Sequence, residues 1–307
     1  MPSFNALDTF VNNFRNQRPI RAGSLIISVY GDTIASRGGT VWLGSLIKLL
    51  EPLGLNQRLV RTSVFRLTKG NWLASEQVGR RSYYSLTSSG RLRFSKAFKR
   101  IYIGKNTEWK GGWTLVLLTQ LSQEQRQELR QELEWQGFGS LTSTVMIHPQ
   151  ISRTELQGIL QEFDYQDQAI VLDTLHEDIA VSRVMLLQAQ ESWNMEQLSH
   201  SYKQFLEQFR PIWKQLKEQE EPSPEQCFFI RLLVVHEYRR VMLRDPDLPE
   251  ELLPADWAGS AARQLCSNIY RRVWKPAETH LNQALETADG PLPPPTANFY
   301  KRFGGLE

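Results

Sequence analysis

Cationic side chains recur at helical spacing in the segment QRLVRTSVFRLTK, which spans residues 57–69 and contains no carboxylate. Its polar and cationic residues are Gln57, Arg58, Arg61, Thr62, Arg66 and Lys69. Guanidinium, ammonium and amide groups pair with phosphate oxygens and with base edges in the major groove of DNA. We therefore predict that these residues contact double-stranded DNA. The alternative is a basic helix face that meets only solvent.

A basic hairpin is predicted directly after this helix. Two β-like runs, residues 72–77 and 82–86, are separated by Val-Gly-Arg-Arg, a combination typical of a tight turn. Arg80 and Arg81 would lie at the tip, where cations suit phosphate contacts beside a groove. Taken alone, the hairpin is equally compatible with a purely structural role.

The neighbouring elements place this helix and hairpin in a familiar order. Asn56 is a suitable N-cap, and Val60, Val64 and Leu67 form an apolar stripe that a small domain would bury. Helices are also predicted over residues 24–36 and 41–53. Helix, turn, helix and basic hairpin is the order of a winged helix-turn-helix, whose second helix enters the major groove. We assign residues 22–87 to such a DNA-binding domain.

Charge is distributed unevenly along the chain. Residues 1–110 contain 18 Lys and Arg against 5 Asp and Glu, a net charge of +13, whereas the remainder has a net charge of −10. A basic first third is an electrostatic partner for a polyanion such as DNA, and the acidic remainder is not.

A second domain is predicted over residues 111–180. Strands over 113–118, 142–148 and 169–175 alternate with helices over 122–137 and 152–163, and residues 138–141 leave room for a fourth strand. This order fits a ferredoxin-like fold and resembles the nuclease-like Cas2 proteins. Those enzymes use an acidic residue at the end of the first strand, but the segment WTLVLLTQLS contains none. We therefore expect a dimerisation or ligand-sensing domain.

The rest of the chain is predicted to be helical. A linker helix is expected over residues 88–110 and a helical domain over 181–289, with a central helix, CFFIRLLVVHEYRRVMLR, that is apolar around most of its circumference. Charges inside such a helix need partners. A pairing of Glu237 with Arg240 or Arg244 would satisfy them, and a charged ligand is the alternative. Residues 1–21 are expected to form an arm or frayed helix, and residues 290–307 a mobile tail. The predicted fold class is α+β.

Several functional classes are disfavoured by the sequence. Cys227 and Cys266 are isolated from ligand-type neighbours, which argues against a zinc site or a disulfide framework. A nucleophile elbow of the Gly-x-Ser-x-Gly type is absent. No apolar run approaches the ~20 residues needed to cross a bilayer, and the N-terminus lacks a secretory pattern. We therefore expect a cytoplasmic, non-enzymatic protein without cofactor, metal or membrane partner.

Three segments resemble the PaaX family, the repressors of phenylacetic acid degradation operons. They are NQRLVRTSVFRLTKGNWL with GRRSYYSLT, then GGWTLVLL, and finally the most specific, RLLVVHEYRRVMLRDPDLPEELLPADWAG. The resemblance implies a transcriptional regulator, usually a repressor of aromatic-acid catabolism, with phenylacetyl-CoA as the effector that releases DNA. It also implies that Arg58, Arg61, Thr62 and Arg66 belong to the recognition helix, and Arg80 and Arg81 to the wing.

The expected effector suggests where its site lies. Phenylacetyl-CoA combines a phenyl ring with phosphates, so its pocket should be aromatic-lined with nearby cations. The candidates are Trp193, Tyr202, Trp213, Arg231, His236, Tyr238, Arg239 and Arg240. The structural alternatives are that the aromatic residues are core and that His236 is a hydrogen-bonded core histidine. Release would follow if the acyl-CoA favoured a homodimer whose recognition helices no longer match successive major grooves.

Other functions stay open on the sequence alone. One is a nucleic-acid-processing enzyme built on the Cas2-like domain, which would need clustered carboxylates or metal ligands. Another is a constitutive DNA-binding adaptor without an effector. Activation instead of repression is also open, because the sign of regulation depends on where the operator lies.

Overall fold

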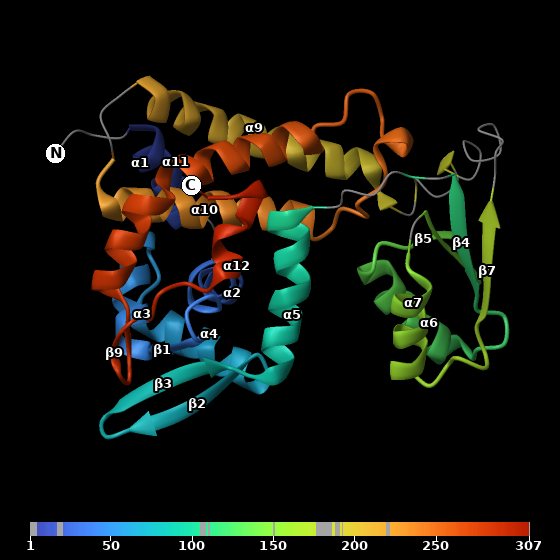
Figure 1. Ribbon diagram of the computed structural model, residues 1–307, viewed down its shortest axis with the longest axis horizontal. Helices are drawn as coiled ribbons and strands as arrows, with labels where there is room; N and C mark the ends of the chain where they lie inside the picture. The colour runs from blue at the N-terminus through green and yellow to red at the C-terminus, as the bar shows by residue number, and fades with distance from the viewer. Residues whose placement is uncertain are drawn as a thin grey trace. The chain divides into compact units, whose positions relative to one another are not determined.

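The structure is a computed structural model of the 307-residue chain. It describes residues 5–16, 21–104, 109, 111–149, 151–175, 186–187, 191, 193–218 and 222–306. The chain forms two compact units, which we describe separately (Figure 1). Unit 1 comprises Met1–Gly104, Lys203–Arg240 and Ser260–Glu307, and unit 2 comprises Lys105–Tyr202 and Val241–Gly259.

The N-terminal part of unit 1 is mainly helical. Its helices are α1 (Asn5–Asn16), α2 (Ala22–Val29), the π-helical turn η1 (Tyr30–Ile34), α3 (Leu43–Leu50), the 3-10 turn η2 (Glu51–Leu53), α4 (Gln57–Lys69), α5 (Ser88–Phe98) and the π-helical turn η3 (Lys99–Ile103). The predicted helix over 24–36 thus continues into a π-helical turn. Its apolar residues, including Leu25 and Ile26, are fully buried, as the pattern indicated.

A small antiparallel sheet accompanies these helices. Its strands are β1 (Thr40–Trp42), β2 (Leu73–Val78) and β3 (Arg81–Leu86), in the order β1-β3-β2. The predicted hairpin is present, with Leu73 opposite Leu86 and Val78 opposite Arg81. The prediction of one helix over 41–53 was wrong at its start. Residues 40–42 pair with β3 instead, and the helix begins at Leu43.

Long helices form most of the rest of unit 1. They are α9 (Met195–Glu218), which belongs to this unit from Lys203 onward, α10 (Pro224–Met242), which belongs to it up to Arg240, and α11 (Gly259–Ala284), which belongs to it from Ser260. They are followed by β8 (Glu286–Thr287), β9 (Gly290–Pro291), α12 (Ala297–Tyr300) and the 3-10 turn η5 (Arg302–Gly304). Helix α10 begins with a capping box, because Ser223 and Gln226 exchange backbone-to-side-chain hydrogen bonds. Its residues from Phe228 to Val235 are buried, so the prediction of a buried central helix is confirmed.

At the N-terminal end of unit 1 the helix alternative is correct, although the helix is packed, whereas the C-terminal end differs from the expected mobile tail. Leu7, Val11 and Phe14 lie on one face of α1 and are buried, so amphipathic spacing fixes this helix to the unit. Near the C-terminus, Phe299 and Arg302 have no exposed surface. The tail prediction was wrong because these side chains pack into the unit and Arg302 pairs with a buried carboxylate.

Unit 2 contains a four-stranded antiparallel sheet in the order β5-β6-β4-β7. Its strands are β4 (Gly112–Leu117), β5 (Gly139–Thr142), β6 (Val145–His148) and β7 (Ile170–Leu175), and its helices are α6 (Gln123–Trp135) and α7 (Arg153–Glu162). A 3-10 turn, η4 (Glu250–Leu252), also belongs to this unit. The sheet order is that of a split βαβ fold, so the ferredoxin-like prediction is confirmed, including its fourth strand. A capping box formed by Ser122 and Gln125 opens α6.

The predicted domain boundaries stay predictions. Residues 17–20, 105–108, 110 and 176–185, which flank or include the boundaries at 21, 110 and 180, lie outside the described residues. Among the residues that the structure describes, no helix is both long and apolar enough to cross a bilayer.

Candidate nucleic-acid interface and an adjoining buried network

Local sequence fixes both ends of α4. The Oδ1 atom of Asn56 accepts a hydrogen bond of 2.9 Å from the backbone amide of Leu59, which satisfies one of the free amides at the helix start. Gly54, at φ 83°, provides the left-handed turn that separates η2 from α4. Asn71, at φ 56°, turns the chain into β2 after the helix ends.

The two faces of α4 have opposite character. Val60, Ser63, Val64 and Leu67 are buried, and α2 packs against this helix. The opposite face is exposed to solvent and carries Gln57, Arg58, Arg61, Thr62, Phe65, Arg66 and Lys69. The structure thus brings the six predicted DNA-contacting residues of this helix together on one accessible face.

The hairpin lies beside α4 in unit 1 (Figure 1). Gly79, at φ 61°, and Arg80 form its two-residue turn, and Arg80 is exposed at the tip. Arg81 is held differently. Its guanidinium lies 4.1 Å from the ring centroid of Trp42 and forms a 2.8 Å ion pair with Glu286, with both partners about half exposed. Arg81 therefore joins the hairpin to β1 and β8, a contact that sequence reasoning missed.

Helix α5 continues from the hairpin through a shared cap. The hydroxyl of Thr87 accepts a 2.9 Å hydrogen bond from the amide of Gly90 and donates one of 2.6 Å to the carbonyl of Asn71. A Cβ atom on Gly90 would collide with the carbonyl oxygen of Trp72. The absence of a side chain at residue 90 is what lets α5 approach the start of β2.

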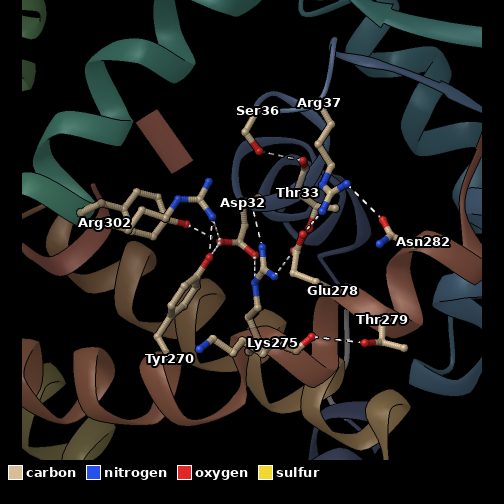
Figure 2. A network of polar contacts seen from close by, with 12 residues as sticks. Asp32, Thr33, Ser36, Arg37, Tyr270, Lys275, Glu278, Thr279, Asn282 and Arg302 are labelled. Atoms are coloured by element: carbon tan, nitrogen blue, oxygen red, sulfur yellow. Dashed lines mark hydrogen bonds and ion pairs between the residues drawn. The ribbon is translucent and has the colours of Figure 1, made fainter. Parts of the chain in front are cut away.

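A buried polar network surrounds Asp32, a residue of η1 (Figure 2). Its Oδ2 atom accepts a 2.7 Å hydrogen bond from Nε of Arg231. Its Oδ1 atom accepts from Nη1 of Arg302 at 3.0 Å and from the hydroxyls of Tyr102 at 2.7 Å and Tyr270 at 3.0 Å. The four partners come from α10, η5, η3 and α11 respectively. Asp32 therefore joins separate segments of unit 1 at one point.

Charge in this network is partly balanced by aromatic faces. Glu278 pairs with both Arg231 and Arg37, so two carboxylates meet three guanidinium groups. The guanidinium of Arg302 also lies 4.4 Å from the ring centroids of both Tyr102 and Phe299, where cation–π attraction offsets part of its desolvation. Burial alone would raise the pKa of Asp32. The positive charges of Arg231 and Arg302 and the hydrogen bonds from the two tyrosine hydroxyls outweigh this effect, so the pKa lies below its usual value. The carboxylate is thus ionised.

Two of the predicted effector-binding residues of α10 bind α2. Nδ1 of His236 lies 2.9 Å from the hydroxyl of Ser28, and Arg239 donates to Ser28 at 3.1 Å and to the hydroxyl of Ser24 at 2.8 Å. Burial, together with Arg239 and Arg240, holds the pKa of His236 well below its usual value. This histidine is therefore neutral and hydrogen-bonded, in agreement with the core alternative.

The other predicted effector-binding residues are divided between the units. Arg240 forms a 2.8 Å ion pair with Glu237, which confirms the structural pairing. In unit 1, Tyr238 packs against Phe205, and Arg231 binds Asp32. Trp213 also lies in this unit, with the ammonium group of Lys217 over its ring. In unit 2, Trp193 donates to the carbonyl of Gly137, and Tyr202 donates a 2.7 Å hydrogen bond to Asp245. The effector assignment stays a prediction, and its cations have protein partners.

One cavity in unit 1 adjoins the hairpin contact. It has a volume of about 210 Å³ and is lined by Trp42, Lys48, Glu225, His280 and Glu286, among others. Pockets for drug-sized ligands have volumes of about 300–1,000 Å³. The cavity is therefore too small to enclose an acyl-CoA in this conformation.

The described residues of unit 2 offer little of the chemistry of a nuclease. Asp173 on β7 accepts a 2.9 Å hydrogen bond from Thr114 on β4 and forms a 3.3 Å ion pair with Arg153. Within the described part of the chain, no three His, Cys, Asp or Glu side chains gather as a metal site would require.

These features define an α+β protein with an exposed basic helix-and-hairpin surface and a Cas2-like central domain. Models of a PaaX-like protein, of the PaaX central Cas2-like domain and of the PaaX-like C-terminal domain match residues 21–90, 106–185 and 193–283. The chain is 43% identical over 302 residues to Transcriptional repressor PaaX of Escherichia coli (strain K12), covering 98% of this chain and 95% of that protein. The chain belongs to the PaaX family.

A solved structure shares the fold at low sequence identity. An uncharacterized protein from Mycobacterium tuberculosis superposes with a TM-score of 0.50 at 20% identity, over 77% of this chain and 89% of that one. This likeness concerns the fold alone.

Proposed function

We propose that this protein is a transcriptional repressor that binds operator DNA through a winged helix-turn-helix over residues 22–87. In this proposal α4 is the recognition helix and the β2–β3 hairpin is the wing. The observation that carries it is the exposed face of α4, with four cations and no carboxylate, followed along the chain by a hairpin with Arg80 exposed at its tip. The relative named as a transcriptional repressor supports the same function.

We assign different tasks to the residues of this surface. Arg58, Arg61 and Arg66, with Gln57 and Thr62, have the donors and reach to contact base edges from α4. Lys69 and Arg80, near the helix end and the hairpin tip, suit phosphate contacts that set orientation. We assign Arg81 a positioning role, since Trp42 and Glu286 already hold its guanidinium.

Selection of duplexes from a random DNA pool tests this proposal. The purified full chain should enrich a defined duplex sequence, and Arg61→Ala should weaken binding to it about 5-fold or more, since a base contact by arginine contributes about 1–3 kcal/mol. Arg210→Ala, which removes an exposed cation from α9, is the matched control and should bind like the wild type. Equal losses in both variants would show only a general charge effect.

The proposed function requires no chemical reaction. A repressor acts by occupying DNA, and the related Escherichia coli protein is named for that activity. We therefore assign the chain no catalytic residue and no cofactor. We place the proposed regulator in the cytoplasm, where bacterial DNA is found.

We further propose that phenylacetyl-CoA releases the protein from the operator of phenylacetate catabolic genes. The support is the family resemblance and the coupling in unit 1, where Arg239 and His236 of α10 bind the helix α2 that packs on α4. A ligand that shifts α10 would thereby shift the recognition helix. Titration of phenylacetyl-CoA into a gel-shift should weaken operator binding, and unchanged affinity at saturating ligand would leave a constitutive DNA-binding protein.

The proposed repressor acts as a homodimer, because two recognition helices must reach successive major grooves. Sedimentation of the full chain should give twice the 35.5 kDa mass of one chain. The selected duplex should then contain two half-sites in dyad arrangement. A monomer in solution that also selects a single half-site would contradict the dimer.

A further inference from the structure

The outer face of α4 contains one large apolar side chain. The DNA contacts proposed for the cations of this face do not explain why an apolar side chain is there. Phe65 is 60% exposed. Single exposed apolar residues are ordinary on protein surfaces, so exposure by itself indicates nothing. Its position is informative. At about 100° of rotation per residue, Phe65 lies about 20° from Arg58 and about 40° from both Arg61 and Lys69 around the helix axis.

This position is opposite the buried stripe of α4. Val60, Val64 and Leu67 face the interior of unit 1, so Phe65 is near the middle of the face that points to solvent. Its ring contacts the Nζ atom of Lys69, which lies 5.7 Å from the ring centroid. The ring is therefore presented among cations, at the centre of the surface proposed to enter the major groove.

The major groove displays one apolar group, the 5-methyl group of thymine, which distinguishes a T·A pair from the other base pairs. Arginine side chains read the acceptors of guanine through their N–H groups. A phenyl ring among such arginines supplies the complementary chemistry. We propose that Phe65 reads a thymine methyl group in each half-site and thereby determines specificity at that base pair.

This inference rests on the proposed function. The expected change in affinity follows from the apolar area that the contact buries. Covering one methyl-sized group contributes about 0.8 kcal/mol, which corresponds to about a fourfold change in affinity. Thr62, one turn away on the same face, also carries a methyl group and is the competing reader of thymine. The experiment must therefore separate the two residues.

Replacement of thymine by deoxyuridine removes only the methyl group and provides the test. After duplex selection with the full wild-type chain, each thymine of the selected sequence is replaced in turn, and affinity is measured by fluorescence anisotropy. For the wild type, the affinity should fall about three- to fivefold when thymine is replaced at one particular base pair of each half-site. Phe65→Ala should bind the thymine duplex about as weakly as the wild type binds the deoxyuridine duplex. Its own affinity should fall less than 1.5-fold when that thymine is replaced by deoxyuridine.

Two further variants complete the measurement. Phe65→Leu retains an apolar side chain and should retain part of the sensitivity to the methyl group, whereas Thr62→Ser should retain all of it. Equal sensitivity of Phe65→Ala and wild type at every thymine would overturn the inference, as would a sensitivity abolished by Thr62→Ser. A wild-type chain that enriches no duplex would instead refute the proposed function, at the selection step and before any thymine is replaced.

Discussion

Asp32 is the residue on which the buried contacts of unit 1 converge. It lies in η1, directly after the helix that packs on α4, and it accepts hydrogen bonds from two arginines and two tyrosines. A buried carboxylate with this many donors is stabilised in its ionised form, and each donor in turn depends on it. Asp32 thus links the N-terminal elements to α10, α11 and η5.

Asp32→Asn should destabilise unit 1 by about 3–5 kcal/mol, because it leaves Arg231 and Arg302 buried without their shared counter-charge. Urea unfolding followed by circular dichroism measures the loss. Glu286→Gln breaks the half-exposed ion pair with Arg81 and should cost less than about 1 kcal/mol. Equal midpoints for the two variants would contradict the role given to Asp32.

The same carboxylate predicts acid sensitivity. The folded-state pKa of Asp32 is lowered, so its contribution is complete above the unfolded value of about 3.9 and is lost as the pH falls through the lower folded value. Unfolding free energies measured between pH 3 and 6 should fall toward acid. This slope should be shallower in Asp32→Asn, and an identical slope would contradict the assignment.

His236 predicts a second pH dependence at a higher pH. Its folded-state pKa lies well below its usual value of about 6.5, so the unfolded chain takes up the proton first and stability falls as the pH drops below about 6.5. His236→Gln should flatten the slope between pH 7 and 5.5. Part of the slope should remain, since burial also lowers the pKa of His280. An unchanged slope would show that His236 titrates normally.

Residue-level prediction succeeded where a local pattern determines exposure. The spacing of Val60, Val64 and Leu67 identified the buried face of α4 and therefore the exposed one. It failed for Asp32, which lies in the helix predicted over residues 24–36 and has no partner in the local pattern, and for Arg302, which lies in the segment predicted as a tail. Both are fixed by partners more than 190 residues away along the chain, Arg231 for Asp32 and Asp32 for Arg302, and no local pattern contains such a pairing.

Among the elements, the junction of β2, β3 and α5 depends on one close backbone approach. Thr87 caps α5 and binds the carbonyl of Asn71, while Gly90 lies against the carbonyl of Trp72. The hairpin proposed as the wing is therefore held at both of its ends, by α4 before it and by α5 after it. This arrangement fixes the hairpin base and leaves the tip with Arg80 exposed.

Gly90→Ala should destabilise this junction by about 1–3 kcal/mol, since the added methyl group forces backbone atoms apart. Gly23→Ala is a suitable control because a Cβ on this residue of α2 meets nothing within 4 Å, and alanine favours a helix. Thermal unfolding should show a lower midpoint for Gly90→Ala and an equal or higher one for Gly23→Ala. A normal midpoint for Gly90→Ala would contradict the tight packing.

Element prediction from the sequence was accurate where caps and periodicity agree. Asn56 marks a helix start that the structure contains, and the helices predicted over 122–137 and 152–163 begin within one residue of α6 and α7. The strand β1 was missed because three residues are too few for an alternation pattern, and because the strand is defined by its pairing with β3, where Val41 lies opposite Tyr84. The boundary between strand and helix at Leu43 is thus a tertiary effect.

At the scale of the whole molecule, the helical and N-terminal segments of unit 1 behave as one body. Arg239 and His236 bind α2, and the Asp32 network binds η1 to four other segments, α10, α11, η3 and η5. The sequence suggested separate DNA-binding and helical domains, because composition and periodicity change between them. The contacts between these segments join residues that are far apart along the chain. A division into domains based on local sequence patterns therefore cannot predict them.

The central claim is that α4 occupies the major groove of operator DNA. Cys227 and Cys266 are buried, so Thr62→Cys on the exposed face of α4 provides a selective attachment site for a tethered iron-EDTA cleavage probe. The labelled protein should cut the selected duplex at two clusters about one helical turn, or a multiple of it, apart, whereas wild type treated with the same reagent should not cut. Tight binding without cleavage by the probe at residue 62 would contradict the account.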